Sequence, residues 1–427
     1  MGGETRPLRV VLDARMGDGM SGGIQQWVIG LARAMSQLDD GAEEYLFLAS
    51  PGRDEWVREY VSGPCRVVLA PPSAVSRRES KRRRRRALRR RGRLSVLRDL
   101  YRRLVRREPR RALSAEHRVL ETEGAHVMHF TTQSGFFTSL PTIYQPWDLQ
   151  HLHMPEFFTP ERYREREAAY RAFCAQAAAV VVPTNWAKRD LVRQYRVPAK
   201  RVAVVNPPPV TWAYTVPSAA DEAEVVARLG LPERFVLYPA VTWGHKNHER
   251  LFEALASLHR RGIDVQLVCT GRVHERHDAL TALAERLGIE RQVRFLGFVD
   301  TTEIQVLYRR ATALVFPSLY EGWGLPVVEA FASDLPVAAS TATSLPDLVG
   351  DAGLQFDPYD PGAIAAAIEV LWLDDGAREE YARRGRARVE AFSWEHTARL
   401  LRALYRRVAG RPLEPSDRDH LAMPAVV

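Results

Sequence analysis

The chain has 427 residues, 46% of them apolar, which is enough to build two domains that each bury a core. Its three cysteines (Cys65, Cys174 and Cys269) lie far apart, which excludes a disulfide framework and a structural zinc site. The net charge of +9 is local, because residues 77–111 hold 19 of the 61 Lys/Arg but 3 of the 52 Asp/Glu. We find no signal peptide and no apolar stretch near the roughly 20 residues that span a bilayer, so we expect a cytoplasmic protein.

Short apolar, β-branched runs alternate with helix-like segments along the whole chain. Continuous apolar runs of this kind are typical of strands buried on both faces of a parallel sheet. The alternation predicts repeated βα units and therefore doubly wound α/β sheets. The expected strands are 9–14, 45–50, 66–70, 126–130, 142–146, 179–184 and 202–206, then 235–241, 265–271, 293–299, 313–318 and 336–340.

Clustered prolines in "NPPPVTWAYTVP", residues 206–217, interrupt the alternation. Because proline fits neither a central strand nor a helix interior, this stretch is predicted to be a linker. We expect a first Rossmann-like domain over 1–208 with a basic insertion at 77–111, and a second over 209–392. Residues 393–427 would form a helix that returns to the first domain, followed by a tail. The end of that tail, 418–427, shows no period and is expected to be disordered.

The first strand is followed by "RMGDGMSGG", whose glycines at 17, 19 and 22 spell G-x-G-x-x-G. A dinucleotide site needs the first glycine directly after the strand and an acidic residue at the end of the second strand. Residues 13–16 stand between the apolar run of the first strand and Gly17, and the second strand ends in Ser-Pro-Gly. The motif is therefore either a plain surface loop or, with Gly22 and Gly23 opening a helix, an anion-binding helix N-terminus.

The most informative stretch is "FPSLYEGWGLPVVEAFASDLPVAAS", residues 316–340. It predicts a buried strand, a turn and a helix that begins near Pro326, since proline suits the first helical position. Gly322 and Gly324 would let the backbone approach a ligand, and the amides of Gly324 and Leu325 would face it. Glu321 and Glu329 would then both point to the carboxyl edge of the sheet. Two carboxylates suit a polyhydroxylated ligand.

The stretch "PSLYEGWGLPVVEA" resembles the hallmark of retaining GT-B glycosyltransferases of glycosyltransferase family 4. The resemblance extends through "VVLDARMGDGMSGGIQQW", "WDLQHLHMPEFF", "VVVPTNWAKRDL" and "DAGLQFDP". It implies a GT-B fold, in which two Rossmann-like domains face a central cleft. It also implies a metal-independent hexosyltransferase that uses a nucleotide-sugar as co-substrate and needs no cofactor.

The resemblance also implies roles for single residues of the second half. Glu321 would contact hydroxyls of the donor hexose, and Glu329 would hold the nucleotide ribose. Lys246, in "TWGHKNHERL", would neutralise the donor diphosphate. Many relatives carry an arginine where this chain has Val241, and Arg272 is our candidate to replace it. We also count the following among the donor-binding residues: Gly22, Gly23, Phe298, Gly322, Trp323, Gly324 and Leu325.

A second polar cluster, "YQPWDLQHLHMPEFF", follows a strand of the first domain. Its H-x-H spacing lacks well-spaced third and fourth ligands, so we expect no metal. Relatives place polar residues here against acceptor and donor sugar, which makes Asp148 and His151 catalytic candidates. The alternatives are a helix cap for Asp148 and a packed histidine for His151. Trp147 stands where relatives often have a histidine.

Three interpretations of the basic segment 77–111 stay open. It is a charged insertion, a helix that contacts an anionic membrane or lipid-linked acceptor, or a nucleic-acid site, which its single aromatic residue disfavours.

The predicted enzyme transfers a hexose, with mannose from GDP-mannose suggested by family habit. The acceptor would be a saccharide, a lipid-linked glycan or a small molecule, and the enzyme would be cytoplasmic or peripheral at the inner membrane face. The alternatives are a nucleotide-sugar epimerase and a non-catalytic polyanion-binding protein.

Overall fold

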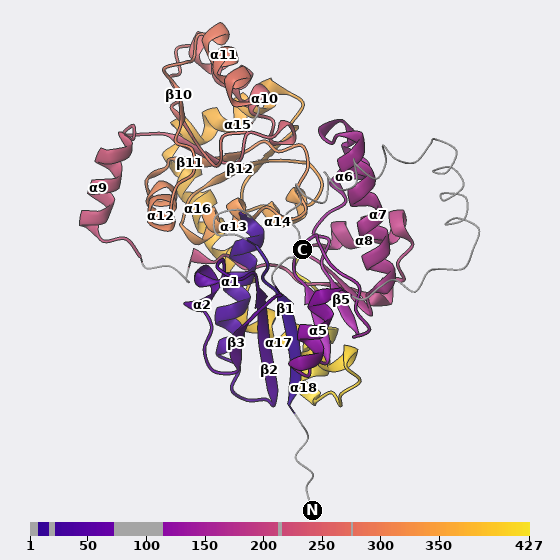
Figure 1. Cartoon of the computed structure of the whole chain (residues 1–427). Coiled ribbons are helices and arrows are strands. Elements are labelled where there is room, and N and C mark those ends of the chain that lie inside the picture. Colours follow the sequence, from indigo (N-terminus) through magenta and orange to yellow (C-terminus); the bar gives the residue numbers. More distant parts are fainter. Residues whose placement is uncertain (1–6, 17–21, 72–113, 212–215, 275) are drawn as a thin grey trace, which may run out of the picture.

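A computed structural model describes residues 7–16, 22–71, 114–211, 216–274 and 276–427. The basic segment 77–111 and two glycines of the G-x-G-x-x-G motif, at 17 and 19, lie outside the described residues. The described chain builds two α/β domains, each with one parallel sheet (Figure 1). The prediction of two doubly wound parallel-sheet domains is confirmed.

The sheet of the first domain has seven strands in the order β3-β2-β1-β4-β5-β6-β7, all parallel. Its central strands are buried on both faces because helices cover them, as the continuous apolar runs predict. The strands are β1 (Leu8–Asp13), β2 (Glu43–Ala49), β3 (Cys65–Leu69), β4 (Val127–Phe130), β5 (Thr142–Tyr144), β6 (Ala179–Val182) and β7 (Val202–Val204). The helices are α1 (Gly23–Ser36), α2 (Glu55–Arg58), α5 (Ala115–Thr122), α6 (Gln150–His153), α7 (Pro160–Gln176) and α8 (Asn185–Tyr195).

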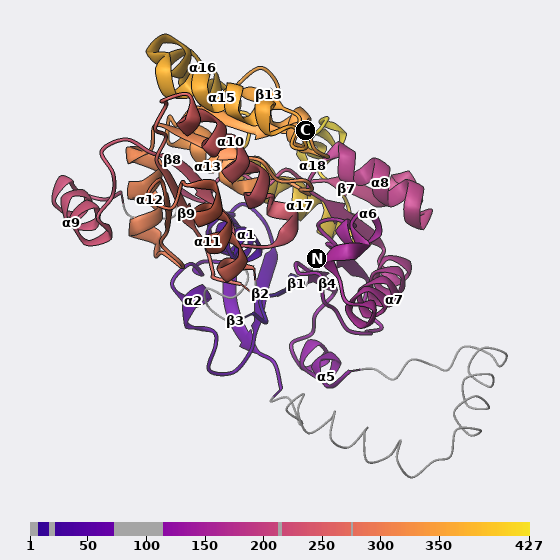
Figure 2. The same ribbon diagram turned by 90° about the horizontal axis from the view of Figure 1, so that it is seen from above.

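The sheet of the second domain has six parallel strands in the order β10-β9-β8-β11-β12-β13. The strands are β8 (Val236–Pro239), β9 (Leu267–Thr270), β10 (Val293–Phe295), β11 (Ala313–Phe316), β12 (Val337–Ser340) and β13 (Leu354–Phe356). The helices are α9 (Ala219–Leu229), α10 (His248–Arg260), α11 (His277–Leu287), α12 (Thr301–Arg310), α13 (Leu325–Ala332), α14 (Leu345–Val349), α15 (Pro361–Leu373) and α16 (Asp375–Val389). Figure 2 shows α15 and α16 together at one side of this domain.

After the second domain the chain crosses back, and α17 (Trp394–Val408) packs on α1 of the first domain. The yellow helix therefore lies among the indigo elements in Figure 1. Gly30 permits this contact, because a Cβ at that position would lie 1.9 Å from the Trp394 ring. The segment that leaves the first domain and the segment that returns to it are in contact, because the Trp394 indole N–H donates to the Pro209 carbonyl at 2.8 Å. The domain boundaries themselves stay a prediction.

The expectation of a disordered tail is wrong, because α18 (Pro415–Ala422) continues the fold. Arg406 of α17 binds the buried carboxylates of Glu43 and Asp417, at 2.7 and 2.8 Å. Val427 is buried, and its carbonyl accepts from the Asn185 N–H at 2.9 Å. These contacts come from β2, α8 and α17, all distant in sequence, so local periodicity carries no sign of them.

Candidate active site

Two helix N-termini, one from each domain, meet where the domains touch. Gly22 has a positive φ (46°) that only glycine adopts readily, and it turns the chain into α1. A Cβ on Gly23 would lie 3.4 Å from Leu325, the first residue of α13. Gly324 also has a positive φ (119°) and opens α13. The predicted glycine-rich turns of the two halves are therefore neighbours, and the positive ends of two helices lie close together.

Two hydroxyls that follow β12 hold the backbone of Glu321. Thr343 accepts from the Glu321 N–H at 2.9 Å and donates to the Glu321 carbonyl at 2.7 Å. Ser344 donates to the same carbonyl at 2.9 Å. Thr343 has a positive φ (54°), a strained conformation for a β-branched residue that the surrounding bonds maintain. The loop that carries Glu321 is thus fixed from the neighbouring strand.

The side chain of Glu321 pairs with Lys246. The Lys246 Nζ atom lies 2.5 Å from Glu321 Oε1, and both side chains keep a small exposed fraction, 16% and 13%. Asn247, in the left-handed region (φ 63°), shapes the turn before α10 and donates to the Pro317 carbonyl at 3.0 Å. The structure therefore brings together the two charges that the sequence placed 75 positions apart. A partly exposed ammonium and carboxylate in contact can separate to bind a phosphate and sugar hydroxyls.

Glu329 lies one turn into α13, half-buried, and accepts a hydrogen bond of 2.8 Å from the Tyr308 hydroxyl. Burial raises its pKa to about 7, and the Tyr308 bond opposes that rise in part. This carboxyl group therefore keeps its proton to higher pH than an exposed glutamate does. It is able to accept hydrogen bonds from vicinal hydroxyls once it is ionised.

Arg272 and Phe298 lie on the neighbouring loops that follow β9 and β10. Both are exposed, and the Arg272 guanidinium carbon lies 5.8 Å from the centroid of the Phe298 ring. A Cβ on Gly271 would lie 2.9 Å from the Val241 nitrogen. Arg272 is therefore next in sequence to Gly271, which lies against Val241, the position where many relatives carry an arginine. Its role as the replacement cation stays a prediction.

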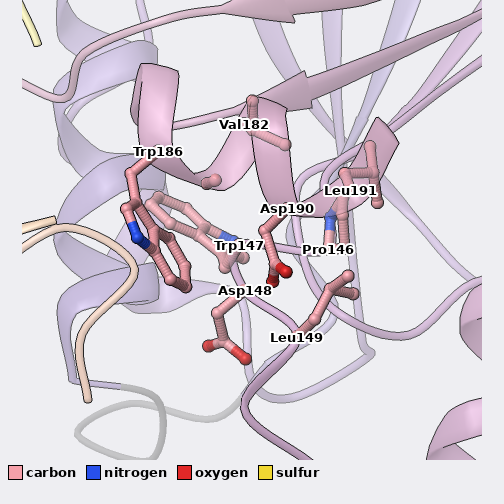
Figure 3. A pocket seen from close by; sticks show the side chains of 9 residues that line it. Pro146, Trp147, Asp148, Leu149, Val182, Trp186, Asp190 and Leu191 are labelled. Carbon is pink, nitrogen blue, oxygen red and sulfur yellow. The ribbon is translucent and has the colours of Figure 1, made fainter. Parts of the chain in front are cut away.

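In the first domain, Asp148 is held by two contacts. Its Oδ1 atom accepts from Arg166 of α7 at 2.7 Å and from the Gln150 N–H at 2.9 Å. It lines a small hollow at the carboxyl ends of β5 and β6, where the α8 side chains Trp186, Asp190 and Leu191 lie above Asp148 and Leu149 (Figure 3). The residue that caps α6 is Leu149 and not Asp148, and no described side chain caps this helix. The catalytic role of Asp148 stays a prediction.

His151 is fully buried, and its Nε2 atom lies 3.0 Å from Glu167 and 3.2 Å from the Tyr195 hydroxyl. Burial lowers its pKa. Rings of α7 and its preceding loop pack against it. This environment favours the packed-histidine alternative, and the predicted catalytic role of His151 stays untested.

Several residues around the site carry a weak sequence signal or none. Thr343 and Ser344 belong to a polar run after a strand, which is where parallel sheets bind ligands, so that position was a usable clue. Arg166 sits in a charged helix, and nothing in the pattern pairs it with Asp148. The H-x-H spacing has another explanation, because His153 binds Asp190 at 2.8 Å.

Within the described ranges, no group of three or more His, Cys, Asp or Glu side chains is arranged to hold a metal ion. In the same residues no helix is long and apolar enough to cross a membrane. The predicted contact of segment 77–111 with an anionic membrane falls outside these ranges and stays a prediction.

Comparisons with known proteins agree with this architecture. The family model "Glycosyl transferases group 1" matches residues 221–388. The chain is 32% identical over 252 residues to O-antigen chain mannosyltransferase B of Escherichia coli, covering 58% of this chain and 66% of that protein. It is 31% identical over 297 residues to D-inositol 3-phosphate glycosyltransferase of Corynebacterium urealyticum, covering 64% of this chain and 69% of that protein. The matches thus span about two thirds of these relatives' own length.

Among solved structures, HepE of Anabaena, crystallised with UDP and glucose, superposes with a TM-score of 0.65 at 18% identity, over 93% of this chain and 99% of that chain. Two facing parallel-sheet domains of this kind define the GT-B class of glycosyltransferases. The chain belongs to the glycosyl transferases group 1 family, and it is a glycosyltransferase. Its assignment to family 4 stays a prediction.

Proposed function

We propose that this enzyme transfers a hexose from a nucleotide-sugar to an acceptor hydroxyl, with retention of the anomeric configuration. The observation that carries the proposal is the contact between Lys246 and Glu321 beside the N-termini of α1 and α13. A cation and free helix amides suit a diphosphate, and a neighbouring carboxylate suits the hydroxyls of the sugar that it carries. Glu329 would accept hydrogen bonds from the ribose.

In the proposed mechanism the bond between the sugar C1 and the β-phosphate oxygen breaks while the acceptor oxygen bonds to C1 from the same face. The acceptor proton passes to the departing phosphate oxygen. Lys246 and the amides of the helix N-termini stabilise the negative charge that develops on the diphosphate, so the barrier to its departure falls. This route needs no glycosyl–enzyme intermediate and no metal ion. Asp148 would orient the acceptor hydroxyl from the first domain.

Mannose from a GDP donor is the substrate we propose to test first, because mannosyltransferase B is among the similar relatives. UDP donors come next, since HepE binds UDP. A mannosyltransferase that acts on a saccharide or lipid-linked acceptor is the resulting working assignment. The enzyme would act in the cytoplasm or at the inner face of the membrane.

The experiment is a thermal-shift panel of GDP-, UDP-, ADP- and dTDP-sugars on the wild type, Lys246→Ala and the exposed control Lys200→Ala. A donor at a hundred times its Kd adds about 2.7 kcal/mol to stability, so the correct donor should raise Tm by several degrees. We expect Lys246→Ala to lose most of that shift and Lys200→Ala to keep it. Absence of a shift with every donor would contradict the proposal.

Product analysis then tests the chemistry. We expect transfer to persist in EDTA and the product to keep the donor's anomeric configuration by NMR. An isomerised nucleotide-sugar formed without acceptor would show an epimerase instead. A glycosyl adduct trapped on the protein would contradict the one-step mechanism.

A further inference from the structure

Tyr320, the residue before Glu321, belongs to the second domain but lies in a socket made by the first. Its hydroxyl accepts from the Leu149 N–H at 3.3 Å. Its ring centroid lies 5.6 Å from that of His153 and 5.7 Å from that of Trp186. The side chain is 3% exposed. Leu149 and Trp186 also line the hollow of Figure 3, so the socket is continuous with the place where Asp148 lies.

The same loop approaches the first domain at two further points, both at Gly322. A Cβ on Gly322 would lie 2.7 Å from the Trp147 carbonyl oxygen. The Thr184 hydroxyl, at the start of α8, donates to the Gly322 carbonyl at 3.5 Å. Glu321 is therefore bracketed by two residues that touch the other domain.

The backbone of Glu321 itself is hydrogen-bonded within the second domain, to Thr343 and Ser344. The position of the Glu321 carboxylate thus depends on two supports. One is internal to the second domain, and the other exists only while the domains are in contact.

We propose that Tyr320 is a positioning residue that couples contact between the two domains to the placement of Glu321. This inference rests on the proposed role of Glu321 toward the donor hexose. When the domains meet, Tyr320 enters the socket of Leu149, His153 and Trp186 and fixes the neighbouring carboxylate. When they part, the loop keeps the Thr343 and Ser344 bonds but loses its outer support.

If Tyr320 acts in this way, diphosphate binding and sugar transfer should respond differently to its loss. Of the proposed diphosphate and ribose ligands, Lys246, Glu329 and the N-terminus of α13 belong to the second domain, and the N-terminus of α1, which belongs to the first, lies outside the socket. A nucleoside diphosphate should therefore bind without the socket. Sugar transfer needs Glu321 in place and should depend on the socket. Loss of Tyr320 should therefore lower kcat while it leaves diphosphate affinity unchanged.

The test compares Tyr320→Phe, Tyr320→Ala, Trp186→Leu and the Tyr320→Ala/Trp186→Leu double variant, with Tyr381→Ala on α16 as the control. We expect a two- to tenfold lower kcat for Tyr320→Phe, which keeps the ring and loses one hydrogen bond, and at least a tenfold loss for Tyr320→Ala. The double variant should be little worse than Tyr320→Ala, because both changes remove one contact. Diphosphate affinity, measured by calorimetry, should stay within twofold throughout.

A kcat for Tyr320→Ala within twofold of the wild type would overturn the proposal. So would a parallel loss of diphosphate affinity, because Tyr320 would then support the second domain itself. If the wild type transfers no sugar at all, the proposed function fails, and amide hydrogen exchange still tests the coupling. Exchange at Leu149 should then rise in Tyr320→Phe and Tyr320→Ala, and unchanged exchange in both would overturn it.

Discussion

Glu329 is a carboxyl group whose pKa the fold raises well above its ordinary value. Its pKa is about 7 because burial penalises the charged form more than the Tyr308 hydroxyl favours it. In the unfolded chain the group ionises near pH 4.5. Between these two values the folded state binds the extra proton, so the free energy of unfolding falls as pH rises.

We therefore predict that Glu329→Gln gains stability relative to the wild type as pH rises from 5 to 8. The relative gain should be on the order of 1–3 kcal/mol, since the amide has no charged form to desolvate. Urea unfolding at the two pH values measures it. Glu290→Gln, at an exposed carboxylate, is the matched control and should show no pH-dependent difference. Equal differences at both pH values for Glu329→Gln would contradict the prediction.

The placement of a site residue could be predicted where its neighbours belong to the same short motif, and could not where they come from a distant part of the chain. Glu321 and Glu329 lie in one short motif, and the structure places both beside the N-terminus of α13. The contacts of Asp148 were not predictable, because Arg166 reaches it from a helix whose packing the motif does not encode. The burial of His151 depends in the same way on rings that the fold brings in from α7.

The contact between α1 and α17 depends on one missing side chain. A Cβ on Gly30 would lie within 2.0 Å of two Trp394 ring atoms, so an alanine forces the helices apart. We predict that Gly30→Ala destabilises the protein by about 1–3 kcal/mol, despite alanine's better helix propensity. Chemical denaturation measures the loss.

Gly376→Ala, near the start of α16, is the matched control for that variant. A Cβ there meets its nearest atom at an ordinary 3.4 Å, so alanine should be neutral or stabilising by up to about 1 kcal/mol. If Gly30→Ala behaved like Gly376→Ala, the α1–α17 contact would not be as tight as described.

Strands with a continuous apolar run were predicted, whereas two elements without such a pattern, β13 and α18, were not. The apolar runs from 313 to 316 and from 337 to 340 became β11 and β12. The strand β13 has no continuous apolar run to predict it, because its three residues are Leu-Gln-Phe. Helix α18 was missed because its stability comes from Arg406 and other distant partners, and its own sequence lacks an apolar face.

At the scale of the whole molecule, one close approach between the domains lies at Gly322, where a Cβ would be 2.7 Å from the Trp147 carbonyl oxygen. The Gly322 backbone has an ordinary conformation, so alanine fits the turn, but the added methyl group would press on the Trp147 carbonyl across the boundary. We predict that Gly322→Ala lowers kcat at least tenfold and weakens diphosphate affinity less, because Lys246 and Glu329 stay in place. Steady-state kinetics measures kcat and small-angle scattering measures the separation of the domains, with Gly376→Ala again as control. An unchanged kcat would show that turnover does not need this approach.

The two-domain plan followed from the alternation of buried strands and helices and from the proline cluster at 206–217. The order of strands in each sheet could not be predicted in this way. In the pairing of β1 with β4, Leu12 and His129 are 117 positions apart, which is beyond the reach of any local pattern.

The return of α17 also sets the order in which the molecule can be completed during synthesis. The core of the first domain includes Trp394, Leu401 and Tyr405, whereas the core of the second lies almost wholly within residues 235–392. At ordinary translation rates of about 5–20 residues per second, the first half waits roughly 10–40 s for its last helix. During that interval the face of α1 that receives Trp394 stays uncovered on the ribosome. The domain that is translated first is the one that finishes folding last.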